Sequence, residues 1–172
     1  MGHEEIMREY ANQRARCAGK SVDELLAITN GDEIEFLQAL EMAIQQKSER
    51  VDVDDLTEEE IIVLAVEALE REVHNGGYGQ FFVNSSREYT PIIVHALFRI
   101  GCSKTAEITN KAIAAAGFQG LAPMALAKAL NAYSGADNQE LDECDQLYYR
   151  AGENIGGKLI DFVKANKNVI QP

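Results

Sequence analysis

Apolar residues recur at every third or fourth position along almost the whole chain of 172 residues. After Thr57, for example, Ile61, Leu64, Ala65 and Ala68 fall on one side of a helix. A period near 3.6 residues is typical of an α-helix that buries one face, whereas a half-buried strand alternates with a period of two. Alternating runs of β-branched residues are few, and the chain has only 3 Pro. The sequence therefore predicts an all-α fold of about eight to ten helices, in a single domain over residues 1–172.

Local signals place the helix ends. Ser21 with Glu24, and Thr57 with Glu60, have the spacing of a capping box, in which each side chain bonds the other residue's backbone N–H. The doublet in Asn75-Gly76-Gly77 is typical of a helix end, because glycine adopts a positive φ without strain. The expected helices cover residues 3–17, 21–30, 32–47, 57–75, 91–101, 103–117, 123–133, 139–151 and 154–166. One of them starts at Pro91, one is capped by Ser103 and one is capped by Asp137 or Asn138.

The net charge is −12 and is spread unevenly. Residues 1–72 carry 7 bases and 19 acids, whereas residues 73–136 carry 5 bases and 2 acids. Phosphates repel such a chain, so nucleic acid and anionic membrane are disfavoured as direct partners, and a basic protein is favoured. No apolar run reaches the length of a transmembrane helix, and the first ten residues are too charged for a signal peptide. We expect a cytoplasmic protein.

Carboxylates gather in two places without an interleaved base. The first set lies in the run VDVDDLTEEE and continues along the helix behind it; it comprises Asp52, Asp54, Asp55, Glu58, Glu59 and Glu60, with Glu67 and Glu70. The second set comprises Asp137, Glu140, Asp142, Glu143 and Asp145. Carboxylates three or four residues apart on a helix are about 5–6 Å apart, which is close to the spacing of successive phosphates along a DNA strand. Each set is either a solvated face or a surface that imitates phosphates.

Other chemistry finds little support in the sequence. Asp52-x-Asp54 begins like a calcium loop, but Thr57 replaces the required glycine and Val63 the bidentate glutamate. No hydrolase, nucleotide-binding or zinc motif is present, so we expect neither an enzyme nor a metal or other cofactor. His95 lies in an apolar run, which predicts a buried, hydrogen-bonded histidine. The 3 cysteines are far apart and predict free, buried or half-buried thiols in a reducing compartment.

The stretch EREVHNGGYGQFFVNSS, residues 70–86, resembles a family signature, E-x-x-N-G-G-[FY]-x-Q-[FY]-F-x-N. It is similar to that of a small bacterial all-helical domain whose best characterised member is a DNA mimic. The resemblance covers about residues 55–165, and its motif residues are expected to be structural: Asn75, Gly76, Gly77, Gln80, Phe81, Phe82 and Asn84. It implies an acidic homodimer that binds a helix-turn-helix transcription factor and keeps that factor off its operator.

The leading hypothesis is therefore a binding protein whose carboxylates occupy the DNA-binding surface of a basic regulator. One alternative is an enzyme or small-ligand-binding protein of the same fold, with a pocket near Tyr78, Gln80 and Asn84. A second alternative is a scaffold whose acidity serves solubility only.

Overall fold

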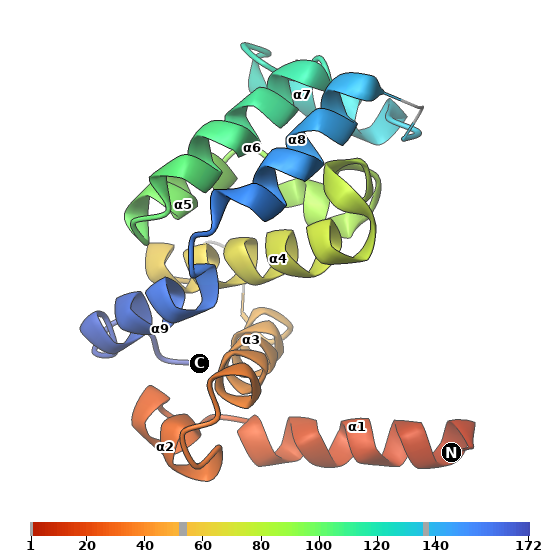
Figure 1. Ribbon diagram of the computed structural model, residues 1–172. Helices are drawn as coiled ribbons and strands as arrows, with labels where there is room; N and C mark the ends of the chain where they lie inside the picture. Colours follow the sequence, from red (N-terminus) through yellow and green to blue (C-terminus); the bar gives the residue numbers. More distant parts are fainter. Residues whose placement is uncertain (1, 52–54, 136–137) are drawn as a thin grey trace. The chain divides into compact units, whose positions relative to one another are not determined.

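A computed structural model describes residues 2–51, 55–135 and 138–172 (Figure 1). These residues form nine α-helices and one short 3-10 helix and contain no strand, which confirms the all-α prediction. The helices are α1 His3–Cys17, α2 Val22–Ile28, α3 Glu33–Ser48, α4 Glu58–Val83, α5 Ile93–Arg99, α6 Ser103–Ala115, α7 Pro123–Ala132, α8 Gln139–Ala151 and α9 Ile155–Ala165, with the 3-10 helix η2 at Ser85–Tyr89.

The predicted helix caps are present at three positions. Ser21 and Glu24 form a reciprocal capping box at the start of α2. The Thr57 N–H donates to Glu60 Oε2 at 3.0 Å, and the Glu60 N–H donates to Thr57 Oγ1 at 3.2 Å, so the second box starts α4. Asn138 is the cap of α8 and accepts from the backbone N–H groups of its first residues. These side chains satisfy donors that a helix N-terminus leaves without an intrahelical partner.

Two predicted helix starts are wrong. The helix expected from Pro91 begins at Ile93, because η2 and a turn occupy the chain before it. Ser103 is already inside α6, and Cys102 stands at the cap position without a side-chain hydrogen bond.

The chain packs as two compact units. The terminal unit consists of Met1–Leu64 together with Gly156–Pro172, and the central unit consists of Ala65–Ile155. The expectation of a single domain over residues 1–172 stays a prediction.

In the terminal unit, polar contacts join segments that are far apart in the sequence. Arg16 on α1 forms an ion pair with Glu35 on α3 at 2.9 Å. Lys167, which follows α9, forms another with Asp23 on α2 at 2.8 Å. Apolar contact accompanies them, because α9 passes so close to α3 that a Cβ on Gly156 would lie 3.7 Å from Leu37. Contacts from both the N-terminal helix and the C-terminal segment therefore stabilise this unit.

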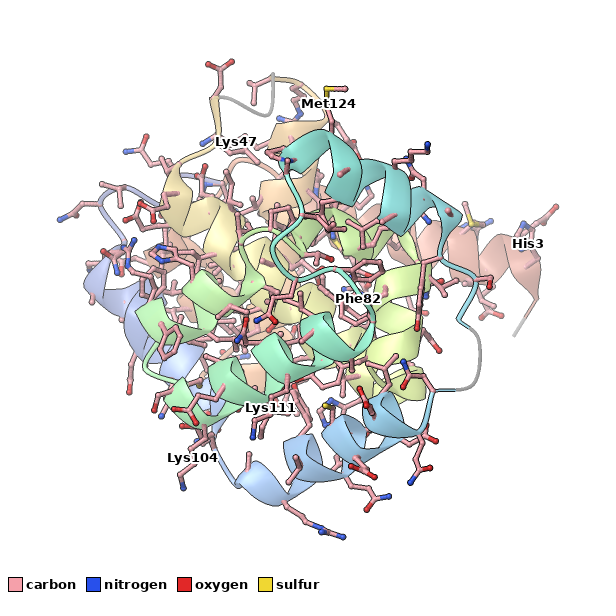
Figure 2. The ribbon with its side chains drawn as sticks, turned by 90° about the horizontal axis from the view of Figure 1, so that it is seen from above. His3, Lys47, Phe82, Lys104, Lys111 and Met124 are labelled. Atoms are coloured by element: carbon pink, nitrogen blue, oxygen red, sulfur yellow. The ribbon has the colours of Figure 1, made fainter. Side chains whose placement is uncertain are left out.

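The central unit is built around an aromatic cluster. Tyr78, Phe81 and Phe82 are fully buried, and Phe82 meets the Phe118 and Tyr133 rings edge-on, with centroids 5.2 and 6.1 Å away. Helix α6 packs against both α5 and α8 (Figure 1). Figure 2 shows Phe82 enclosed by the ribbon. Aromatic pairs of this geometry add to the stabilisation that burial of their area provides. The family signature is called the NGG motif below, and its aromatic residues Tyr78, Phe81 and Phe82 form the core of this unit.

None of the described helices combines the length and the apolar composition that a membrane crossing requires.

Candidate functional site

The first acidic set is divided by the structure. Asp52 and Asp54 lie outside the described residues. Asp55 and Glu58 are exposed, and Glu59 is half-buried. These three carboxylates stay in the predicted partner surface.

Glu60 was predicted to belong to the partner surface, and this prediction is wrong, because its side chain is fully buried. Lys47 Nζ on α3 donates to both carboxylate oxygens, at 2.8 and 2.9 Å. The backbone N–H of Gln171 donates to Oε1 at 2.8 Å, and the Thr57 N–H donates to Oε2. Glu60 therefore joins α3, α4 and the C-terminal segment inside the terminal unit, and it is unable to meet a partner.

The second acidic set lies on α8. Asp137 is outside the described residues, whereas Glu140, Asp142 and Glu143 are exposed in the first turns of the helix. Within the described part of the chain, none of these three carboxylates forms an ion pair, although Glu143 accepts from Gln139 Nε2. The N-terminal end of a helix favours negative charge, which offsets part of the repulsion among these exposed carboxylates.

Asp145, the last member of that set, is a second correction. Its side chain is half-buried, and Oδ1 accepts a hydrogen bond of 2.8 Å from the backbone N–H of Tyr78. Burial raises the pKa of Asp145, and the nearby charge of Asp142 adds to that effect, while the bond from Tyr78 opposes it. Asp145 serves the interior of the central unit more than its surface.

Glu67 and Glu70 on α4 are half-buried. The Glu70 carboxylate accepts a hydrogen bond from the Tyr148 hydroxyl of α8. Burial raises the pKa of Tyr148 strongly, and the charge of Glu70 raises it further, so the phenol stays protonated and donates. Glu70 is thus an internal acceptor, and its predicted supporting role at the partner surface is weakened.

The glycine doublet divides α4 into two helical segments, so the helix end predicted at Asn75-Gly76-Gly77 is confirmed, whereas the helical segment directly behind it was not predicted. Gly76 (φ −175°, ψ 27°) and Gly77 (φ 76°, ψ −174°) leave the helical region, and helical backbone resumes at once through the aromatic segment as far as Val83. A break of this kind leaves carbonyl groups and N–H groups without intrahelical partners.

Helix α8 supplies the missing partners on both sides of the break. The Tyr149 hydroxyl donates to the carbonyl oxygen of Val73 at 2.8 Å. On the other side, Asp145 accepts from Tyr78 as described above. One helix therefore satisfies the last turn before the break and the first turn after it, and this holds the NGG motif in place.

Glu72 is a structural residue that reasoning from the sequence missed. It is buried, and its Oε2 accepts from Gln80 Nε2 at 3.0 Å and from Asn84 Nδ2 at 2.7 Å. These three side chains are the polar positions E, Q and N of the signature. The sequence signal for Glu72 was present, because the motif begins with a glutamate three residues before Asn75. The Glu72 carboxylate orients the side-chain amides of Gln80 and Asn84.

The alternative site near Tyr78, Gln80 and Asn84 corresponds to a pocket of about 580 Å³ in the central unit. Gln80 and Asn84 line it, whereas Tyr78 is buried and does not. The residues in its wall are mostly polar, in contrast to the apolar lining that is usual for small-molecule sites.

The histidines and cysteines give one correction and one confirmation. His95 is exposed, so the expected core histidine is wrong. Cys17, Cys102 and Cys144 are buried and form no disulfide, which confirms the predicted burial of the thiols. The described residues contain no group of His, Cys, Asp and Glu side chains that could hold a metal ion.

The thiols of the native protein should react slowly with Ellman's reagent. Burial raises the pKa values of Cys17 and Cys144, and the thiolate is the reactive form. We expect little colour in native buffer and the full signal of 3 thiols after unfolding in guanidinium chloride. Rapid reaction of one thiol under native conditions would show that a cysteine is accessible.

Comparison with known proteins places this geometry in a family. No curated protein and no solved structure matches the chain. The family profile described as DMP19-like protein matches residues 54–166, a range that contains α4 to α9 and the whole NGG motif. DMP19 is a family of DNA-mimic proteins. The chain belongs to the DMP19-like protein family.

Proposed function

We propose that the chain is a DNA mimic that binds the DNA-binding face of a helix-turn-helix transcription regulator and keeps it from its operator. Family membership supports the mimicry, and the net charge of −12 supports a basic partner. Arg and Lys side chains that contact phosphates in DNA would contact carboxylates here. The role requires binding only, so no catalytic group is assigned.

The observation that carries the proposal is the exposed carboxylate set at the start of α8, in which Glu140 and Glu143 are three residues apart on one side of the helix and Asp142 lies on a different side. Glu140, Asp142 and Glu143 are exposed on a helix whose start is capped by Asn138. Farther along, α8 is held by the hydrogen bonds to Tyr78 and Val73. Carboxylates on a helix fixed in this way keep their spacing, whereas a solvated loop would lose conformational entropy when it binds. Carboxylates at fixed positions are what a DNA-like surface requires.

A homodimer is part of the proposal. Helix-turn-helix regulators bind as dimers, with recognition helices about 34 Å apart. Two copies of the chain would supply two carboxylate sets, one for each recognition helix. Sedimentation of the pure protein tests this element, and a monomer at micromolar concentration would contradict it.

Capture from a bacterial lysate tests the function. The immobilised chain should retain a DNA-binding protein, and a salt gradient should elute that protein early, because exposed ion pairs are screened. In a competition assay, the chain should displace operator DNA from the captured protein. Capture of no DNA-binding protein, or capture without displacement of DNA, would contradict the mimicry.

Neutralising the exposed carboxylate set of α8 should weaken this complex. We expect the triple variant Glu140→Gln, Asp142→Asn, Glu143→Gln to bind about 10- to 100-fold more weakly, since each lost surface pair contributes up to about 1 kcal/mol. The control is Glu4→Gln, Glu5→Gln, Glu9→Gln on α1, which removes the same charge from exposed positions outside the matched range. Titration calorimetry at one salt concentration measures both. Equal losses would indicate that only the net charge matters and would remove α8 from the interface.

A further inference from the structure

The pocket beside the break in α4 has a defined polar wall within the central unit. Its volume is about 580 Å³, which suits a small organic group. The lining residues that matter here are Gly76, Gln80, Asn84, Tyr133, Asp142 and Asp145. They come from three separate segments: the second half of α4, the turn after α7, and α8.

The two amides of this wall are oriented by Glu72. Each uses its NH₂ group to donate to Glu72 Oε2, so the oxygen of each amide is left as an acceptor. The Gln80 oxygen lies directly over the backbone of the pocket residue Gly76, where a Cβ would meet Oε1 at 2.2 Å. The absence of a side chain at position 76 therefore leaves room for this acceptor at the pocket wall.

The same wall carries two carboxylates and no base. Asp142 is exposed, Asp145 is half-buried, and the described lining residues include no Lys, Arg or His. Asp145 uses Oδ1 for the Tyr78 N–H, and its carboxylate forms no ion pair with another described residue. A wall of this composition favours a cationic group with many donors.

Tyr133 gives an independent indication of a missing partner. Its hydroxyl oxygen is buried and has no hydrogen-bond partner among the described residues. Burial raises the pKa of Tyr133, and the charge of Asp145 contributes, so the hydroxyl stays protonated. A buried polar group without a partner costs about 1–3 kcal/mol, and a ligand that bonds the hydroxyl would recover this.

We propose that the pocket binds a guanidinium group. Its five N–H donors in a planar fork match a wall that offers two carboxylates, two oriented amide oxygens and a hydroxyl. An ammonium group has only three donors and fits the same wall less well. The group belongs either to a small free compound or to an arginine side chain of a protein. The inference does not depend on the proposed function, although an arginine source would link the two.

Binding can be followed with ethylguanidinium as the probe. In ¹⁵N–¹H NMR spectra of the full chain, we expect shifts at Gly79, Gln80 and Ser134, saturating at millimolar concentrations, and weaker binding of ethylammonium. A second titration with the blocked peptide acetyl-Gly-Arg-Gly-amide distinguishes the sources. Binding of the peptide at the same residues assigns the pocket to a chain-borne arginine, whereas binding of the small probe alone assigns it to a free ligand. No shifts with either compound would overturn the proposal.

Matched variants separate a built site from general attraction of a cation. Asp142→Asn removes a lining carboxylate and should weaken ethylguanidinium binding about tenfold, the effect of about 1.4 kcal/mol. Glu140→Gln removes an equal charge two residues away, outside the lining, and should change the affinity less than about twofold. Tyr133→Phe removes only the hydroxyl and should also weaken binding. Equal effects of Asp142→Asn and Glu140→Gln would overturn the proposal, and unchanged circular dichroism of each variant confirms that the fold is kept.

Discussion

Gly77→Ala should lower the free energy of unfolding by about 3–5 kcal/mol, a large share of the stability of a small protein. Gly77 has φ 76° and ψ −174°, a conformation that is almost exclusive to glycine. A Cβ at this position would also lie 2.1 Å from Asp145 Oδ2, so the carboxylate would have to move. Its displacement removes the partner of the buried Tyr78 N–H, and the two costs add.

Two neighbouring glycines provide matched controls for this effect. A Cβ on Gly79 meets nothing within 4 Å, so Gly79→Ala should leave stability unchanged or raise it by up to about 1 kcal/mol. A Cβ on Gly76 would meet the flexible end of Gln80, and its φ of −175° is open to any residue. Gly76→Ala should therefore fall between the other two, because it costs only the bond from Gln80 to Glu72.

Urea unfolding followed by circular dichroism gives the ranking directly. The expected order of destabilisation is Gly77→Ala, then Gly76→Ala, then Gly79→Ala. An equal loss at Gly77 and Gly79 would mean that the break tolerates side chains. In that case the hydrogen bond between α8 and Tyr78 would not depend on glycine.

The helices could be predicted from the sequence because their signals are local. The capping boxes at Ser21 and Thr57 and the cap at Asn138 need only three or four neighbouring residues, and all three are present. The period of the apolar residues also predicted that each helix buries one face. These signals depend on contacts that form within one or two turns, so they do not require knowledge of the rest of the fold.

The helical segment behind the break at Gly76-Gly77 could not be predicted, for the opposite reason. A glycine doublet ends a helix, and helical backbone resumes directly behind it only where other groups satisfy the freed backbone. Here those groups come from Asp145 and Tyr149, about 70 residues later in the chain. The sequence did not indicate this long-range contact, because Asp145 also fits the pattern of a series of surface acids. A titratable residue in an acidic run is therefore assigned correctly only when the partners across the fold are known.

Glu60 also could not be assigned without knowledge of its partners across the fold. Its two possible roles predict different losses in the free energy of unfolding when its side chain is removed. As part of a partner surface, Glu60 would contribute little to folding. As the buried acceptor for Lys47, Gln171 and Thr57, it should contribute strongly. We expect Glu60→Ala to lower the free energy of unfolding by about 3–5 kcal/mol, because removal of one partner leaves the Lys47 charge and two backbone N–H groups poorly compensated.

A comparison with two further variants identifies the cause of that loss. Glu58→Ala changes an exposed residue in the same helical turn and should cost less than about 1 kcal/mol. The double variant Lys47→Met, Glu60→Leu removes both charges and fills their volume, so it should recover part of the loss, although the N–H groups of Thr57 and Gln171 still lack their acceptor. Full recovery would show that the ion pair alone carries the effect. A cost for Glu60→Ala as small as that for Glu58→Ala would instead return Glu60 to the exposed acids and to the predicted partner surface.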